Sequence, residues 1–230
     1  MTYKDGKNFY RHLGKYTPGD PGDGYNVSYC MDPKVCWNRI AKCCSTTISR
    51  IFKEYSVDGA IQDHPSKSSP KQRIFCWGHC PYDPEKWADY FKFCFVRNPW
   101  DRLLSAYTSK VRNKQGGCSA YLQSFEQSIP FTDFVKIVKD YYDLDRHLMP
   151  MHDLVMGKDF SNMDFVGRFE NFEEDFLFVL KTTGLPCRDI PHRNKTKHGH
   201  YSDYYDDEAR EIVSKVYKRD IEYFGYEFGD

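Results

Sequence analysis

The chain of 230 residues has no excess charge of either sign, because 33 lysines and arginines balance 33 aspartates and glutamates. A neutral chain offers no diffuse field for nucleic acid or an anionic membrane, so any anion site must be built locally. The sequence also lacks an apolar run as long as a signal peptide or a membrane span. These absences predict a soluble, cytoplasmic protein, although a domain cut from a longer secretory-pathway protein would look the same.

The cysteines do not form a recognisable disulfide or metal framework. Nine are present, and Cys36, Cys76 and Cys94 lie in apolar runs where a free thiol acts as a small hydrophobic side chain. Cys76, His79 and Cys80 have the residue types of a zinc site, but zinc needs further ligands at matching spacing, and no second pair is present. The sequence therefore predicts reduced structural cysteines and no metal.

The organisation of the chain predicts one α/β domain behind an N-terminal arm. The stretch 17–24 is dense in glycine, proline and aspartate and predicts a loop that ends an arm over 1–24. The remainder, 25–230, has the length of a single domain. Strands are predicted at four aromatic and β-branched runs: 35–40, 73–77, 91–96 and 164–169. Because helical patterns alternate with these runs, we expect a central parallel sheet flanked by helices.

Capping residues predict where the helices begin and end. Asn98 and Pro99 predict the start of a helix that continues to Val111. Asn171 followed by Glu174 resembles a capping box. Gly184 would end that helix, and a last helix is predicted over about 206–223. The polar stretch 116–127 is predicted to be a surface loop.

The first stretch with chemical content lies between a predicted strand and a predicted helix. A turn holds Lys42, and Ser45, Thr46 and Thr47 open the helix. Backbone N–H groups, hydroxyls and one ammonium would then meet at one spot, as a phosphate or sulfate group requires. This segment alone is explained about equally well by an anion site and by an ordinary basic turn before a capped helix that binds nothing. The pattern GxxxxGK[ST] is absent, which disfavours Mg-ATP chemistry of the usual kind.

A second possible anion site follows the predicted strand 91–96. Arg97 leaves the strand end, and Ser105 lies two turns into the next helix. Both would face the carboxyl edge of the sheet, where open α/β folds bind nucleotides. Taken singly, an Arg97 paired with Asp101 and an exposed Ser105 explain the pattern better. Two strand-to-helix anion sites in one chain favour nucleotide binding.

Further candidates lie at the same edge or on basic segments. His79 follows a predicted strand, and an ordinary histidine pKa of about 6.5 suits a general base. The run 191–200 is strongly basic and predicts either a solvated loop or a flap over an anionic cofactor. Scattered basic residues are usually solvated surface, but five of them are weaker candidates to line a cleft for an acidic sugar: Arg112, Lys114, Arg146, His147 and His152.

Together these stretches resemble the sulfotransferases that use 3′-phosphoadenosine 5′-phosphosulfate (PAPS), in particular the Golgi carbohydrate branch with heparan sulfate 2-O-sulfotransferase and the chondroitin and HNK-1 enzymes. RIAKCCSTT is similar to that family's 5′-phosphosulfate loop, and VRNPWDRLLSAY is similar to its 3′-phosphate motif. DFVGRFENFEED and HRNKT resemble its later segments, and WGH resembles part of its HGH segment. The resemblance covers about 35–228.

The chain departs from the family pattern at two places. Cys43 and Cys44 stand where the loop usually has glycine or alanine after the lysine, and Trp77 replaces the first histidine of HGH. The assignment of a base is therefore less well supported by the resemblance than the nucleotide site.

The resemblance implies a P-loop-NTPase-like fold and metal-independent transfer of a sulfuryl group from PAPS to a hydroxyl, with a carbohydrate as acceptor. It makes His79 the general base, and Lys42 the residue that stabilises the leaving nucleotide PAP. A truncated member would work in the Golgi lumen. The residues that the resemblance assigns to nucleotide binding are Lys42, Cys43, Cys44, Ser45, Thr46, Thr47, Arg97, Ser105, Arg193, Lys195 and Thr196.

Two alternatives remain from the residues themselves. A P-loop-type nucleotide kinase shares the strand-to-helix anion site but needs a glycine-rich loop and magnesium ligands, which the sequence does not offer. A non-catalytic module that binds a nucleotide or a carbohydrate would have the same fold and binding residues, and only turnover distinguishes it from an enzyme.

Overall fold

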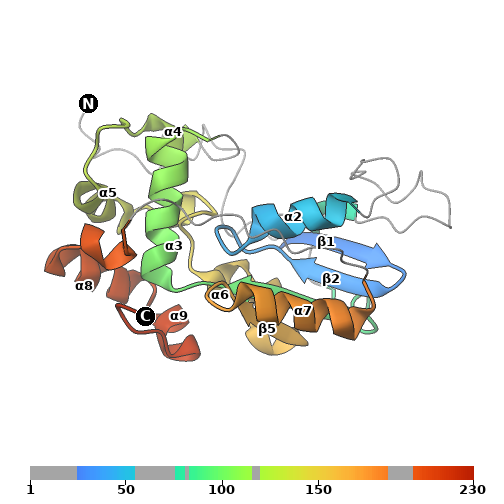
Figure 1. The fold of residues 1–230 in the computed structure, drawn as a ribbon. Coiled ribbons are helices and arrows are strands. Elements are labelled where there is room, and N and C mark those ends of the chain that lie inside the picture. The colour runs from blue at the N-terminus through green and yellow to red at the C-terminus, as the bar shows by residue number, and fades with distance from the viewer. Residues whose placement is uncertain (1–24, 55–75, 81–82, 116–119, 186–198) are drawn as a thin grey trace. The chain divides into compact units, whose positions relative to one another are not determined.

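The computed structural model describes residues 25–54, 76–80, 83–115, 120–185 and 199–230, which are coloured in Figure 1. The predicted N-terminal arm and all but the last two residues of the basic run 191–200 lie outside these ranges. By its internal contacts the chain divides into two compact units. The described residues within 25–97 and 154–185 form one, here called the sheet unit. Those within 98–153 and 199–230 form the other, here called the helical unit.

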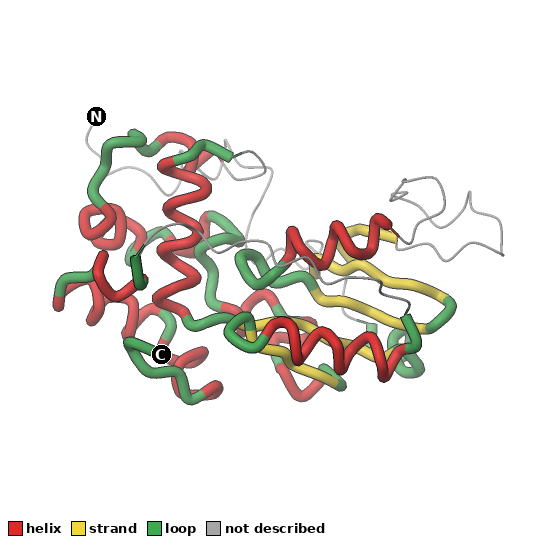
Figure 2. The backbone as a smooth tube through the Cα atoms, in the orientation of Figure 1, coloured by secondary structure: helices red, strands yellow, loops and turns green. Residues whose placement is uncertain are grey.

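Within the described residues, five strands form one sheet in the order β3-β1-β2-β4-β5, and strands are yellow in Figure 2. They are β1 (Tyr25–Met31), β2 (Lys34–Asn38), β3 (Cys76–Cys80), β4 (Phe91–Val96) and β5 (Phe165–Arg168). The pairs β2–β4 and β4–β5 are parallel, whereas β1 is antiparallel to both β2 and β3. The sheet is therefore mixed, and the predicted parallel sheet is right only for β2, β4 and β5.

The error in the predicted sheet has a local cause. Strand β1 was not predicted, and only Asp32 and Pro33 separate it from β2. Two residues can join antiparallel strands in a hairpin, but a parallel connection needs a long crossover. The strands that are joined through helices run parallel, as the alternation of patterns predicts.

Aromatic side chains join two helices to one face of the sheet. Helices α2 (Ser45–Glu54) and α7 (Phe172–Thr183) lie against it. The Phe52 ring on α2 lies 5.6 Å from Trp37 and 6.3 Å from Phe176, and Phe176 on α7 lies 6.2 Å from Phe95. Ile48, Ile51 and Phe52 are buried, as predicted for α2. This packing holds α2 and α7 against the same face of the sheet.

The other face of the sheet is tied to short helical turns, η5 (Met156–Lys158) and η6 (Phe160–Asn162). Asn38, fully buried at the end of β2, donates to the Leu154 carbonyl at 3.2 Å and accepts from the Met156 N–H at 2.7 Å. A buried amide with both ends satisfied holds a unique geometry, because leaving either end unpaired would be costly. The end of β2 is thereby fixed from both sides.

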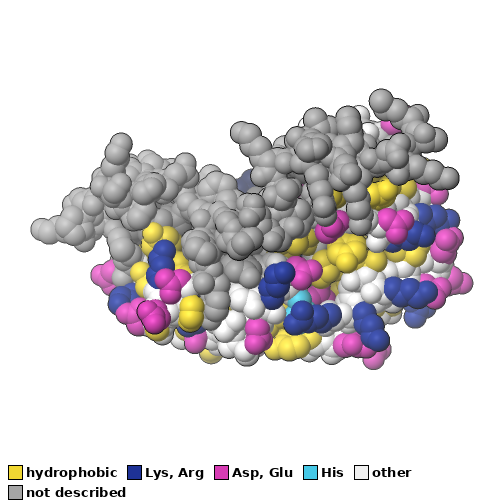
Figure 3. Space-filling view, turned by 180° about the vertical axis from the view of Figure 1, so that it is seen from behind, with side chains coloured by type: hydrophobic (Ala, Val, Ile, Leu, Met, Phe, Trp, Pro, Cys, Tyr) yellow, Lys and Arg dark blue, Asp and Glu magenta, His cyan; other side chains and the backbone are white. Residues whose placement is uncertain are grey.

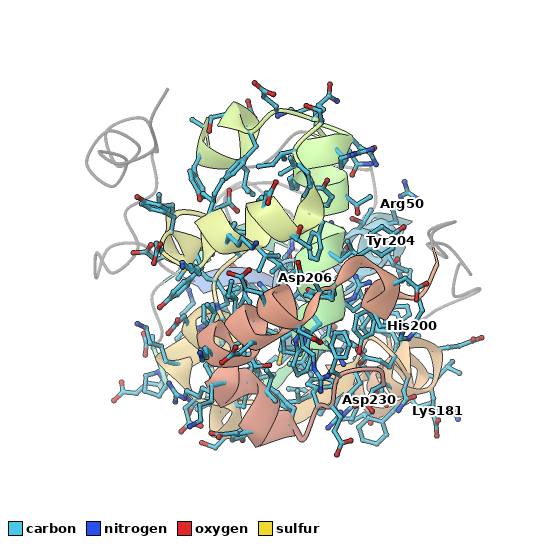
Figure 4. The ribbon with its side chains drawn as sticks, turned by 90° about the vertical axis from the view of Figure 1, so that its left-hand side faces the viewer. Arg50, Lys181, His200, Tyr204, Asp206 and Asp230 are labelled. Carbon is cyan, nitrogen blue, oxygen red and sulfur yellow. The ribbon has the colours of Figure 1, made fainter. Side chains whose placement is uncertain are left out.

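The helical unit begins at the predicted capped helix. Asn98 accepts from the Trp100 N–H, as a capping residue does, and α3 (Pro99–Ala106) runs without a break into the π-helical turn η3 (Tyr107–Arg112). Asp206, labelled in Figure 4, caps α8 (Asp207–Val216) through the Ala209 N–H. The predicted last helix is interrupted at Tyr217, after which α9 (Lys218–Phe224) follows.

Four further short elements complete this unit: α4 (Ala120–Ser124), α5 (Phe131–Val138), η4 (Tyr142–Leu144) and η7 (Tyr201–Tyr204). A small helix, α6 (Met151–Leu154), spans the boundary in sequence between the two units. Over the described surface in Figure 3, acidic and basic side chains are interspersed, which agrees with the neutral composition.

Two local predictions were wrong. The stretch 116–127 is not simply a surface loop, because α4 lies within it and Tyr121, Leu122 and Phe125 are buried. Asn171 makes no capping hydrogen bond with its side chain at α7. Instead, the carboxylate of Asp175 accepts from the Arg168 N–H at 2.6 Å and fastens the turn between β5 and α7.

Candidate functional site

The loop between β2 and α2, residues 39–44, has a left-handed backbone at two residues that are not glycine. Lys42 has φ 69° and Cys44 has φ 58°. The turn is closed by a hydrogen bond from the Cys43 N–H to the Ile40 carbonyl at 3.3 Å, and the Ile48 N–H bonds the Cys44 carbonyl at 3.1 Å. L-residues pay about 1–2 kcal/mol for such a conformation. The chain thus builds this loop without the glycines that such a backbone usually favours.

This strain predicts an inverted order of stability for substitutions at Cys44. Cys44→Gly should be more stable than Cys44→Ala by about 1 kcal/mol, since both lose the thiol but only glycine relieves the left-handed strain. At Thr182, an exposed helical position of α7, Thr182→Ala should instead be more stable than Thr182→Gly by a similar amount. Urea unfolding of the four variants measures both differences. If Cys44→Ala were as stable as Cys44→Gly, or more stable, the backbone at residue 44 would not be strained.

Arg97 holds the same loop from the neighbouring strand. Its side chain is only 7% exposed, Nη1 donates to the Lys42 carbonyl at 3.2 Å, and the guanidinium carbon lies 3.8 Å from the centre of the Phe169 ring. Stacking and a charge-assisted hydrogen bond both restrict the guanidinium. Arg97 therefore positions the backbone of Lys42, a role that the sequence did not suggest.

The Cys44 thiol of this loop carries no charge near neutral pH. Burial raises the pKa of the Cys44 thiol well above its usual range, and the neighbouring Cys43 adds to the rise. The carboxylates of Glu170 and Asp175 also raise this pKa, whereas the Arg97 guanidinium lowers it. A neutral thiol does not repel an anion, so Cys44 is compatible with an anionic ligand in the loop.

Arg39 brings a second guanidinium to this edge and was missed in the sequence. It directly follows β2, and its guanidinium carbon lies 5.3 Å from the centre of the Trp37 ring. Burial lowers the pKa of Arg39 to about 10, so it stays charged at neutral pH although the charged form is disfavoured. A nearby anion would offset that penalty. The sequence offered no signal for Arg39, because a single arginine within RIAK forms no spacing pattern. Only its burial in the structure distinguishes it from other arginines.

The backbone of His79 is placed by strand pairing. His79 pairs with Asn26 in β1, and the next residue of β1, Val27, pairs with both Gly78 and Asn38. His79 is therefore level with the residue just beyond β2, at the edge from which the Lys42 loop leaves. It lies within β3 and not after a strand, since β3 extends to Cys80. The side chain of His79 is not described, so its catalytic role remains a prediction.

Of the remaining predicted ligands, three directly follow the loop, one lies in the helical unit and three lie outside the described ranges. Ser45 and Thr46 open α2, and Thr47 is buried in its first turn. Ser105 is half-buried in α3, within the helical unit. Three predicted residues lie outside the described ranges: Arg193, Lys195 and Thr196.

Other residues of the Arg97 motif are structural. Besides capping α3, Asn98 donates to the Tyr201 hydroxyl at 3.2 Å and to the Glu227 carbonyl at 3.0 Å. The buried Arg102 donates to the carbonyls of Met149 and Arg146, at 2.8 and 3.2 Å. These bonds join α3 to segments far away in the sequence.

The weaker candidates for an acidic sugar are mostly engaged internally, which corrects that prediction. Lys114 donates to the carbonyls of Gln123 and Phe125 near the end of α4. His147 lies 2.6 Å from Asp145, and His152 is buried against Asp220. A buried histidine cannot line an open cleft, so these five residues do not form a common acceptor site.

The described ranges contain neither a candidate metal cluster nor a candidate membrane span. No group of three or more histidine, cysteine, aspartate or glutamate side chains in that part of the chain is arranged to hold a metal ion. None of its helices is long and apolar enough to cross a bilayer.

Comparison with known proteins identifies the family. A family profile described as "Sulfotransferase family" matches residues 25–227. The chain therefore belongs to the sulfotransferase family, which is a family of enzymes, and the resemblance found in the sequence is confirmed. Membership in this family also argues against the kinase alternative. No solved structure matches the chain significantly.

Distant relatives are carbohydrate sulfotransferases. Carbohydrate sulfotransferase 14 of Danio rerio is 27% identical over 188 residues, which cover 71% of this chain and 47% of that protein. The Homo sapiens protein of that name is 30% identical over 188 residues, covering 71% and 46%. Carbohydrate sulfotransferase 10 of Homo sapiens is 24% identical over 247 residues, covering 90% and 66%. The chain thus spans about half the length of the first two relatives.

Proposed function

We propose that this protein transfers a sulfuryl group from PAPS to a hydroxyl group of a carbohydrate. The observation that carries the proposal is the β2–α2 loop, in which Arg97 bonds the Lys42 carbonyl and the loop leads directly into the hydroxyl-rich first turn of α2. The loop coincides with the segment that resembles the family's phosphosulfate loop. The names of the relatives support a carbohydrate acceptor.

The residues of the loop fit an anionic nucleotide. The first turn of an α-helix has N–H groups that the helix itself cannot satisfy, and they favour negative charge. Ser45, Thr46 and Thr47 add hydroxyl donors there, Lys42 adds an ammonium, and the thiol of Cys44 is neutral. In this proposal Lys42 and the α2 N-terminus hold the 5′-phosphosulfate. Arg97, which already positions the loop, and Ser105 hold the 3′-phosphate.

When bound, PAPS supplies both the sulfuryl group and a leaving group that is already good. The chain's residues then have three tasks. His79, level with the start of the Lys42 loop, takes the proton of the acceptor hydroxyl. Lys42 stabilises the negative charge that builds on the departing phosphate oxygen. Arg97 keeps the Lys42 backbone in place, so that its ammonium is oriented before the reaction begins.

Ligand-dependent stability tests this function. PAP without magnesium should stabilise the protein, by about 2.7 kcal/mol at a concentration one hundred times its dissociation constant, because it binds only the folded chain. Thermal unfolding with PAP, with Mg-ATP and with neither measures the effect. Stabilisation by Mg-ATP but not by PAP would favour the kinase. Turnover of labelled PAPS against a panel of glycans then separates an enzyme from a binding module.

A further inference from the structure

Helix α7 has an outer face that is charged at both ends and apolar at the centre. One side of α7 carries four residues spaced by three, one and three positions: Glu174, Leu177, Phe178 and Lys181. All four are exposed, with Leu177 at 42% and Phe178 at 48%. Single apolar residues on a surface are ordinary, whereas adjacent large ones form a patch that can bind a partner.

The apolar centre extends from the helix to the edge of the sheet. The ring of Phe165, half-buried in β5, lies 4.7 Å from the ring of Phe178 at an angle of 34°. Among the described strands, β5 is the last one of the sheet on this side. The patch therefore consists of Phe165, Leu177 and Phe178, on two elements of the sheet unit.

The charges around this patch are self-complementary, so the patch could pair with the same patch on a second copy of the chain. Glu174 precedes Leu177 by three residues, and Lys181 follows Phe178 by three. In an antiparallel pair of α7 helices centred between 177 and 178, Glu174 of each copy lies opposite Lys181 of the other. Leu177 then lies opposite Phe178. Within the described ranges neither Glu174 nor Lys181 takes part in an ion pair, so both charges are available to such a partner.

We infer that a second copy of this chain packs antiparallel on α7, across a two-fold axis between Leu177 and Phe178. A two-fold interface requires a surface that complements itself, and the order acid, apolar, apolar, base meets that requirement. The adjacent carboxylates of Glu173 and Glu174 would repel an anionic membrane. Because few side chains take part, the area is below that of a standard interface, and we expect a weak, reversible dimer.

Sedimentation velocity of the full chain, from low micromolar to the highest soluble concentration, tests the dimer. The wild-type chain should pass from monomer to dimer as concentration rises. Phe178→Glu should weaken the dimer about tenfold or more, since it places two carboxylates at the axis. Lys181→Glu should weaken it less. The double variant Glu174→Lys/Lys181→Glu should restore the wild-type constant, because each reversed charge again meets its opposite.

A matched control uses α8, where Glu211 and Lys215 form an exposed ion pair at 2.7 Å. Reversing these two charges, or replacing Lys215 with glutamate alone, should leave the monomer–dimer equilibrium unchanged. All the altered side chains are exposed, and circular dichroism checks that each variant folds. Lys181, labelled in Figure 4, lies near the end of α7.

Three results would overturn the inference. The first is a wild-type chain that remains monomeric at every concentration. This result would overturn the inference even if the monomer bound zwitterionic vesicles through Phe178. The second is a dimer that Phe178→Glu leaves intact, which would use another surface. The third is failure of the double charge reversal to restore what Lys181→Glu removes, because the opposed pairing of 174 with 181 would then be wrong.

Discussion

Replacing Lys42 with alanine should lower the rate of sulfuryl transfer by about 10²- to 10³-fold while weakening PAP binding much less. Charge builds on the bridging oxygen only as the S–O bond breaks, so an ammonium beside it favours the transition state over the ground state. Lys42→Arg should rescue the rate only in part, since a planar guanidinium does not replace a compact point charge. Both substitutions keep a residue other than glycine at φ 69°, so backbone strain stays matched between them.

Single-turnover rates with labelled PAPS, together with PAP affinities from calorimetry, decide the role of Lys42. His79→Ala provides the comparison: it should lower the rate by about 10²-fold and leave PAP affinity nearly intact, because the proposed base acts on the acceptor hydroxyl and not on PAP. Equal rates for wild type and Lys42→Ala would make Lys42 an ordinary turn residue. A wild-type rate for His79→Ala would remove that histidine from the mechanism.

The elements that the sequence predicted are those whose signals are local. Asn98 caps α3 because its side chain reaches an N–H two residues away, and Gly184 ends α7 with φ 66°. Ile48, Ile51 and Phe52 recur at helical spacing on α2 and are buried. In contrast, the pairing of β1 with β3 and the order of the strands depend on contacts between distant segments, which no local pattern encodes.

The site divides in the same way. The sequence located the loop and its basic residue, because a strand followed by a lysine and a run of hydroxyl residues is a local pattern. It did not reveal the bond from Arg97 to the Lys42 carbonyl, which joins residues 55 positions apart. Nor did it indicate the left-handed backbone at Lys42 and Cys44, because neither residue is a glycine. Tertiary contacts can hold such strain where the local sequence disfavours it.

The buried pair of His152 and Asp220 is the feature of the helical unit whose loss should cost most. Asp220, fully buried in α9, accepts from the N–H groups of Met151 and His152 at 2.6 and 3.0 Å. Its carboxylate also lies 2.5 Å from Nδ1 of His152, which is 3% exposed. One carboxylate thus satisfies three donors and joins α9 to α6. Removing it would leave those donors without water or a partner.

Asp220→Ala should therefore lower the free energy of unfolding by about 3 kcal/mol or more, because it leaves three buried donors unsatisfied at roughly 1–3 kcal/mol each. Asp220→Asn should also destabilise, by a smaller amount, because its amide group would face at least one of the donors. Glu222→Ala is the matched control: Glu222 is exposed on the same helix, 3.6 Å from Lys218, and its loss should change stability by less than about 0.5 kcal/mol. Urea unfolding of the full chain measures all three variants. A midpoint for Asp220→Ala equal to that of the control would mean that α9 does not depend on this carboxylate.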